Sequence, residues 1–169
     1  EANVTPNGVD LRAIEAEKSR LSRESAREAL EVGGELVVAV VGTTTPRKGQ
    51  DIFLREIAAL RESGVPRLRC FIVGAREGEF LEELRGLRAQ LGLESVVELV
   101  AETHDVARYY LAADVMVISS REESAPLVSL EAFAYERPLV STAVFGLGEQ
   151  LSHEENALIF NPNEPGALA

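Results

Sequence analysis

The sequence predicts an α/β fold, in which helices cover both faces of a doubly wound parallel sheet. Short apolar runs rich in Val and Ile alternate with stretches of helical periodicity. The connections between them are short, and two parallel strands need a crossover, which the intervening helices supply. The chain has 169 residues, of which 46% are apolar, so we expect one domain with a sizeable core and not two.

The first predicted βαβ unit opens with Leu36–Val41, which is short, β-branched and free of polar residues. Such a run is typical of a strand covered on both faces. Residues 51–61 carry apolar side chains at helical spacing and are followed by Gly64 and Pro66, which end helices. Residues 68–73 form the second predicted strand.

The same alternation continues to the carboxyl end. The predicted elements are a helix over 79–91 stopped by Gly92, a strand over 96–100, a helix over 106–111, a strand over 115–118, a helix over 127–135, and strands over 139–141 and 157–160. Before the first strand, residues 11–32 are typical of one or two charged helices, with Ser22 as the N-cap of the second and Gly33 and Gly34 behind it. We expect this segment to pack on the sheet rather than to carry chemistry.

Composition excludes several functional classes. The net charge is −11 and aromatic residues are 5%, which argues against nucleic acid and anionic membranes as partners and against a base-stacking RNA module. With no run of eighteen apolar residues and no basic, then apolar, leading segment, neither a membrane span nor a signal peptide is expected. The chain has a single cysteine, Cys70, so a disulfide framework is excluded. This favours a reducing compartment, and we expect a cytoplasmic location. A position at the membrane surface stays open for the full-length protein.

The two ends of the chain predict a piece of a longer protein. The chain begins at Glu1 rather than Met, and it stops at residues 166–169, directly after Pro165, where a helix is expected to begin. A complete mature chain stays open as the alternative.

Four loops at one edge of the predicted sheet are the candidate ligand site, because ligands bind at the carboxyl ends of parallel strands, near the point where strand order reverses. These loops are residues 42–49, 74–78, 101–105 and 119–126. The first places Arg47 and Lys48 ahead of a helix, which suits an oxyanion. It is not a Walker A motif, and no G-x-G-x-x-G follows any strand, so neither a nucleotide hydrolase nor a dinucleotide oxidoreductase is indicated.

The fourth loop combines polar side chains with the start of a helix at Pro126 or Leu127. Free amides at a helix N-terminus favour an anion, yet Glu123 lies just before this start. A nucleotide sugar satisfies both groups, because it offers a diphosphate to the amides and hydroxyls to the carboxylates. Glu131 is expected in the same helix, about two turns beyond Glu123. Solvated charges and ordinary loop capping stay open as alternatives for these residues.

Residues 112–134 closely resemble the signature of GT4-type (group 1) glycosyltransferases, in which a strand, an E-x7-E segment and a helix follow one another. The E-x7-E pair falls on Glu123 and Glu131. Further blocks agree in order and spacing, at residues 6–10 (PNGVD), 46–49 (PRKG), 71–74 (FIVG) and 156–160 (NALIF). The resemblance covers nearly the whole chain. It implies the carboxyl-terminal, donor-binding half of a GT-B enzyme, with a junction and leading helices over 1–34 and a Rossmann-like core over 35–169.

The resemblance also implies roles for individual residues. The second Glu of the pair, Glu131, would hold the ribose hydroxyls, the first, Glu123, would contact the transferred sugar, and Lys48 would neutralise the diphosphate. The donor would also face the backbone amides of Ser124, Ala125, Leu127 and Val128, and the base would face main-chain groups near Ala101 and Glu102. No metal or other cofactor is expected, because basic side chains and the helix terminus take over that task.

Two departures from the family pattern qualify these roles. The family usually has an Arg where this chain has Thr43, and Arg47 is the candidate substitute. Residues 146–149 replace a Gly-Gly followed by Glu, and Glu149 is assigned no role. His104 and His153 are expected to cap loops or lie on the surface.

The predicted function is therefore sugar transfer from a nucleotide-diphosphate sugar to an unknown acceptor, which is a sugar, a lipid or a protein, with retention of configuration. The resemblance implies an amino-terminal GT-B domain as the missing partner, so this chain alone is expected to be inactive. Two alternatives stay open: a sugar-nucleotide epimerase of GT-B architecture, and a binding module without catalysis, with which the change at Thr43 is compatible.

Overall fold

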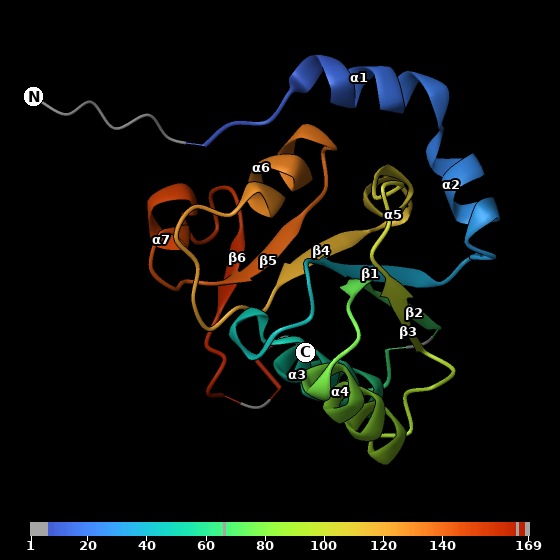
Figure 1. Ribbon diagram of the computed structural model, residues 1–169, viewed down its shortest axis with the longest axis vertical. Helices are drawn as coiled ribbons and strands as arrows, with labels where there is room; N and C mark the ends of the chain where they lie inside the picture. The colour runs from blue at the N-terminus through green and yellow to red at the C-terminus, as the bar shows by residue number, and fades with distance from the viewer. Residues whose placement is uncertain (1–6, 66, 165, 168–169) are drawn as a thin grey trace, which may run out of the picture.

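A computed structural model describes residues 7–65, 67–164 and 166–167. Three expectations fall outside these residues: the Pro6 of the PNGVD block, the helix-ending Pro66, and Pro165 with the last two residues. Within the described part, six strands form one parallel sheet in the order β3-β2-β1-β4-β5-β6 (Figure 1). The predicted doubly wound α/β fold is confirmed.

The strands begin and end close to the predicted residues. They are β1 (Leu36–Val41), β2 (Leu68–Ala75), β3 (Val97–Ala101), β4 (Val115–Ile118), β5 (Leu139–Thr142) and β6 (Leu158–Phe160). β2 is two residues longer than predicted, because its pairing with β3 continues past an irregularity to Ala75, opposite Ala101. Ala101 therefore ends β3 instead of opening the next loop.

Helices cover both faces of the sheet. They are α1 (Leu11–Arg20), α2 (Arg23–Ala29), α3 (Gln50–Glu62), α4 (Glu79–Gln90), α5 (Ala107–Ala112), α6 (Leu127–Ala134) and α7 (Leu147–Gln150), with one 3₁₀ turn, η1 (Pro46–Lys48). α3 and α4 lie on one face, and α1, α2, α5 and α6 on the other (Figure 1). Because successive side chains of a strand point to opposite faces, Val37 and Ala39 enter one core while Val38 and Val40 enter the second.

The leading segment forms two helices, as expected. Ser22 is the N-cap of α2, where its hydroxyl accepts a hydrogen bond from the Ser25 amide at 3.2 Å. Both helices bury side chains in the core, Ile14 from α1 and Ala26 from α2. η1 and α7 are not in the predicted set, because each has only three or four residues, too few for an apolar periodicity.

Glu123 and Glu131 lie where the sequence predicts. Glu123 belongs to the loop of residues 119–126, which contacts other loops across the sheet edge. Glu131 belongs to α6, which begins at Leu127, four residues after Glu123.

Two structural findings agree with the expectations from composition. Cys70 is fully buried, and burial raises the pKa of its thiol to about 12, so the thiol is an unreactive core group. Within the described residues, no helix has both the length and the apolar character needed to cross a membrane.

Candidate functional site

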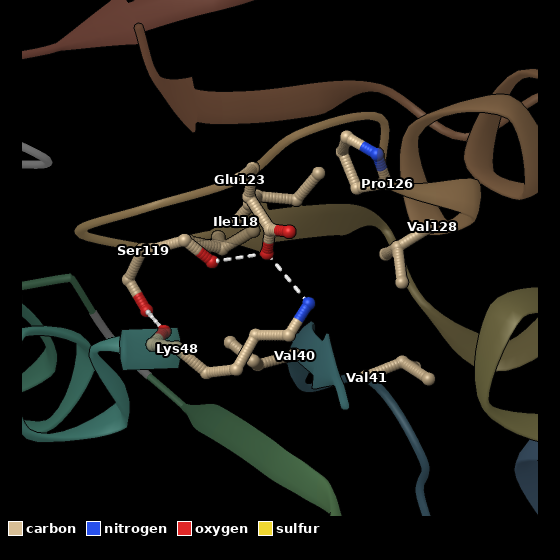
Figure 2. Close-up of a pocket in the computed structure, with 10 residues that line it drawn as sticks. Val40, Val41, Lys48, Ile118, Ser119, Glu123, Pro126 and Val128 are labelled. Carbon is tan, nitrogen blue, oxygen red and sulfur yellow. Dashed lines mark hydrogen bonds and ion pairs between the residues drawn. The ribbon is translucent and has the colours of Figure 1, made fainter. Parts of the chain in front are cut away.

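The point where the strand order reverses lies between β1 and β4, which are neighbours in the sheet. The loops that follow these two strands meet there through an ion pair. The Lys48 ammonium lies 2.5 Å from Oε1 of Glu123 (Figure 2), and the Ser120 hydroxyl donates to the same oxygen at 2.7 Å. The side chain of Glu123 is only 4% exposed and that of Lys48 is 20% exposed. A nearly buried carboxylate thus fixes a cation at the carboxyl edge of the sheet.

Arg47 is a second cation beside this pair, and its contact with Glu123 is longer than that of Lys48. Its guanidinium donates to the Glu122 carbonyl at 3.0 Å and to Oε2 of Glu123 at 3.4 Å, and its side chain is half exposed. Arg47, Glu123, Ser124 and Phe145 line an open hollow of about 280 Å³ beside the pair.

A close contact of backbones holds the two loops in register. Gly49 has a φ of 65°, and a Cβ at this position would lie 2.0 Å from the Ser119 carbonyl oxygen. Only glycine allows this approach. The Ser119 hydroxyl also donates to the Lys48 carbonyl at 3.2 Å.

An arginine clamp adds side-chain bonds to that contact. Arg121 donates to both carboxylate oxygens of Asp51 at 2.7 Å and to the Pro46 carbonyl at 2.8 Å. Burial raises the pKa of Asp51, but the bonds from Arg121 outweigh it, so the net pKa lies below the ordinary value. The bidentate pair therefore stays charged and joins the β4 loop to the start of α3.

Gly146 performs a similar task on the other side of the β4 loop. Its amide donates to the Glu123 carbonyl at 3.0 Å, and a Cβ on it would lie 1.4 Å from the Ser124 carbonyl oxygen. Gly148, two residues later, has open space around the same position.

We therefore expect Gly146→Ala to displace the loop that carries Glu123 and to lower the free energy of unfolding by about 1–3 kcal/mol, because the new methyl overlaps backbone. Gly148→Ala is the matched control and should change stability by less than about 1 kcal/mol, in the stabilising direction, since it replaces glycine inside a helix. Thermal denaturation of both variants measures this difference. Equal melting temperatures would contradict the assigned contact.

The start of α6 supplies backbone donors beside the ion pair. Pro126 is its N-cap residue, and the amides of Leu127 and Val128, in the first turn, have no acceptor within the helix. Pro126 and Val128 lie in the lining of the cavity that holds Lys48 and Glu123 (Figure 2). The neighbouring Ala125 carbonyl accepts a hydrogen bond from the Asn7 side chain at 2.9 Å, so the junction segment contacts this loop.

Glu131 lies one turn further along α6, three residues after Val128 and hence on the same side of the helix. It is half buried, and its Oε2 accepts the hydroxyl of Tyr110 at 2.5 Å. Burial, followed by the charge of Glu131, raises the pKa of Tyr110 well above its ordinary value. Glu131 is thus held inside the fold and is not a solvated helix position.

The remaining candidates form a separate cluster at the ends of β1, β2 and β3. The Thr43 hydroxyl donates to Glu102 at 3.2 Å, and Arg76 forms an ion pair with the same carboxylate at 2.8 Å. Thr43 and Glu102 line a hollow of about 380 Å³ with Gly42, Gly74 and His104 among others. The Glu102 amide donates to the Ala75 carbonyl at 3.3 Å, so this amide is already hydrogen-bonded to the end of β2.

The structure thus brings most of the predicted residues to one edge of the sheet. The Lys48 cavity also holds Glu123 and Val128, the open hollow beside it holds Arg47 and Ser124, and the third hollow, which shares Val41 with the cavity, holds Thr43 and Glu102. Ala101, Ala125, Leu127 and Glu131 line none of these three hollows. His104 and His153 are exposed, as expected. Sequence reasoning missed Ser120, Arg121 and Tyr110, whose contacts with the site come from the fold. Among the described residues, no group of three or more His, Cys, Asp or Glu could hold a metal ion.

The class of protein follows from a comparison with known families. A family model described as "Glycosyl transferases group 1" matches residues 22–169, a range that includes all six strands of the sheet. The chain belongs to this family. Its fold is that of a Rossmann-like glycosyltransferase domain.

Particular relatives narrow the comparison. The D-inositol 3-phosphate glycosyltransferase of Saccharomonospora viridis is 37% identical over 147 residues, covering 82% of this chain and 34% of that protein. Anabaena HepE, crystallised with UDP-glucose, has a TM-score of 0.82 at 25% identity, covering 96% of this chain and 44% of HepE. The C-terminal domain of LpcC, a group 1 glycosyl transferase from Francisella tularensis, shares the fold with a TM-score of 0.75 at 21% identity, covering 93% of this chain and 82% of that one. This chain spans about a third of the length of the curated relative.

Proposed function

We propose that this chain is the donor-binding domain of a retaining, GT4-type glycosyltransferase of GT-B architecture. The observation that carries the proposal is the Lys48–Glu123 ion pair, which lies where the strand order reverses and next to the N-terminus of α6. Ligands of open α/β sheets bind at that point. A cation and a carboxylate held side by side suit a ligand with both a diphosphate and sugar hydroxyls.

In the proposed site, Lys48 neutralises the departing diphosphate. Its ammonium has three protons, and one of them is directed to Glu123, so another can turn toward a phosphate oxygen. The amides of Ser124, Ala125, Leu127 and Val128 are the backbone donors for the same group. As the bond from the sugar to the diphosphate breaks, negative charge gathers on the leaving oxygen, and these preorganised donors stabilise it. This assignment requires neither a metal nor another cofactor.

Glu123 and Glu131 form the proposed E-x7-E pair. Glu123 faces the transferred sugar, because its carboxylate borders both the Lys48 cavity and the open hollow with Arg47. Glu131 accepts the ribose hydroxyls from the same side of α6 as Val128. The hollow lined by Thr43 and Glu102 would take the base, with Ala101 beside it.

Arg47 is the proposed substitute for the cation that the family has at the position of Thr43. Its guanidinium contacts Oε2 of Glu123, whereas Lys48 contacts Oε1, so both cations lie beside the carboxylate that would face the sugar. Anabaena HepE has been crystallised with UDP and with UDP-glucose, which makes UDP the first nucleotide to test here. An amino-terminal domain would complete the cleft, and the acceptor, a sugar, lipid or protein, would bind mainly there. We also propose a cytoplasmic location.

The 169-residue chain alone should fold, bind one of UDP, ADP or GDP, and transfer no sugar. A half-cleft lacks the opposite wall that excludes water and completes the catalytic set, so we expect a Kd in the high micromolar to millimolar range, or about 4–6 kcal/mol. Isothermal titration calorimetry measures the binding, and an assay with a nucleotide sugar measures transfer. Multiple-turnover transfer by this chain, abolished by Glu123→Ala, would show that it is more than half an enzyme.

The same experiments separate the alternatives. An epimerase would convert the nucleotide sugar in the full-length protein without any acceptor. If the chain is a non-catalytic module, the full-length protein should bind the nucleoside diphosphate but should not transfer the sugar.

A further inference from the structure

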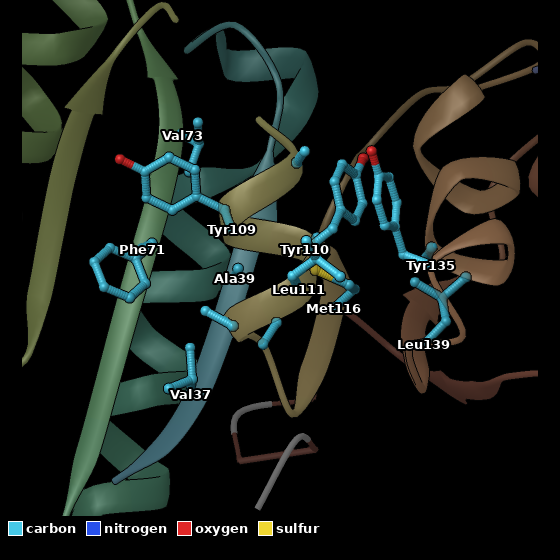
Figure 3. Packing of buried hydrophobic residues seen from close by; sticks show 14 of the residues in the cluster. Val37, Ala39, Phe71, Val73, Tyr109, Tyr110, Leu111, Met116, Tyr135 and Leu139 are labelled. Carbon is cyan, nitrogen blue, oxygen red and sulfur yellow. The ribbon is translucent and has the colours of Figure 1, made fainter. Parts of the chain in front are cut away.

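Two tyrosines, one from α5 and one at the end of α6, stack on each other, and each donates its hydroxyl to a different glutamate. Tyr110 of α5 and Tyr135 at the end of α6 have ring centroids 4.8 Å apart with an angle of 8° between the rings (Figure 3). The Tyr110 hydroxyl donates to Glu131 at 2.5 Å, and that of Tyr135 donates to Glu17 of α1. Two similar tyrosines therefore serve two different carboxylates.

Packing restrains the Tyr110 side chain on the side of α6 that carries Glu131. It is fully buried, one of its faces is covered by the Tyr135 ring, and it belongs to the same core cluster as the strands beneath it. Its hydroxyl, which burial keeps protonated, is a fixed donor at one oxygen of a half-buried carboxylate. A glutamate has three rotatable side-chain bonds, so such a donor selects one of several orientations.

We propose that Tyr110 is a positioning residue for nucleotide binding, whose hydroxyl holds the Glu131 carboxylate in the orientation that accepts the ribose hydroxyls. This inference rests on the proposed function, because it needs Glu131 to face the ribose. The bond to Tyr110 uses one direction at Oε2 and leaves Oε1 and the second lone pair of Oε2 available to a ligand. Preorganisation of this kind raises affinity, because the side chain does not lose freedom on binding.

The test compares three ligands that differ only at the ribose. NMR titration, which measures millimolar Kd values, is run with whichever of UDP, ADP or GDP binds the wild-type chain, and with its 2′-deoxy and 3′-deoxy analogues. The variants are Tyr110→Phe, Glu131→Ala and, as the matched control, Tyr135→Phe, which removes the hydroxyl of the other stacked tyrosine.

We expect Tyr110→Phe to raise the Kd of the ribonucleotide about three- to tenfold, the cost of ordering one flexible side chain on binding, and to change the Kd of at least one deoxy analogue less than twofold. The preference for ribose would then approach that of Glu131→Ala, whereas Tyr135→Phe would keep the wild-type preference. A merely structural role of Tyr110 would weaken the binding of all ligands by the same factor.

The outcomes distinguish the inference from the proposed function. If Glu131→Ala loses the preference for ribose but Tyr110→Phe keeps it, the inference is wrong and the assignment of Glu131 stands. If Glu131→Ala keeps the preference, the assignment of Glu131 to the ribose is wrong, and the inference falls with it. Should Tyr110→Phe fail to fold, the hydroxyl proton of Tyr110 in the wild-type chain is the second measurement. Its NMR signal should shift more with the ribonucleotide than with the deoxy analogues, and equal shifts would overturn the inference.

Discussion

Replacing Glu123 by glutamine in the full-length enzyme should lower sugar transfer at least 100-fold, while this chain keeps its affinity for the nucleoside diphosphate within about threefold. Glutamine retains the volume and an oxygen acceptor for Ser120 and Lys48, so the loop keeps its shape. It loses the negative charge that faces the transferred sugar in the proposed site, and electrostatic groups aimed at the reacting centre contribute about 10²–10³ in rate. Steady-state transfer kinetics measure the loss, and calorimetry on the chain measures the binding.

Glu122→Gln is the matched control for that prediction. Glu122 is the neighbouring glutamate, and its side chain is exposed, so its replacement should change transfer by less than about threefold. Comparable losses in both variants would contradict the assignment of Glu123, because the effect would then follow the charge of the loop and not one carboxylate.

Replacing Lys48 by methionine together with Glu131 by alanine should weaken the binding of the nucleoside diphosphate at least about 30-fold. Each residue is assigned charge-assisted hydrogen bonds to a different group of the ligand, the diphosphate and the ribose, and each loss costs about 1–3 kcal/mol. Effects on separate ligand groups add, so the pair removes about 2–6 kcal/mol from a binding free energy of about 4–6 kcal/mol. Methionine keeps the apolar stem of Lys48, which packs near Gly42.

The matched control for this pair of changes is Arg55→Met with Glu83→Ala. Both residues are exposed on α3 and α4, away from the hollows at the sheet edge, and the change in net charge is the same. The control should bind as the wild-type chain does. Calorimetric affinities that are equal in the control and in the Lys48–Glu131 variant would contradict both site assignments.

The sequence predicted strand ends well where neighbouring residues alone determine them. β1 and β4 begin and end at the predicted residues, because an apolar run bounded by polar or glycine residues marks both ends of a buried strand. β2 was predicted too short. Its extension through Gly74 to Ala75 depends on pairing with β3, and the apolar run of β2 alone does not indicate which residues pair with a neighbouring strand.

The meeting of the predicted loops at one sheet edge could also be predicted, but their contacts could not. The rule for open parallel sheets selects the loops that hold Lys48 and Glu123. Their direct pairing joins residues 75 positions apart, and it depends on backbone approaches such as that of Gly49 to Ser119. The bond from Tyr110 to Glu131 has the same origin, because a tyrosine in an apolar helix is first of all a core residue. Such contacts appear only once two loops or two helices are placed beside each other.

The most direct test of the donor site is a two-dimensional amide NMR titration of the ¹⁵N-labelled chain with UDP, ADP and GDP. The proposal predicts that one nucleotide gives saturable shifts, largest at the amides of Ser124, Leu127, Val128 and Thr43, at the carboxyl ends of β1 and β4. Saturable shifts centred at the opposite ends of the strands, around Glu35 and Arg67, would contradict it. So would the absence of any saturable shift at millimolar nucleotide.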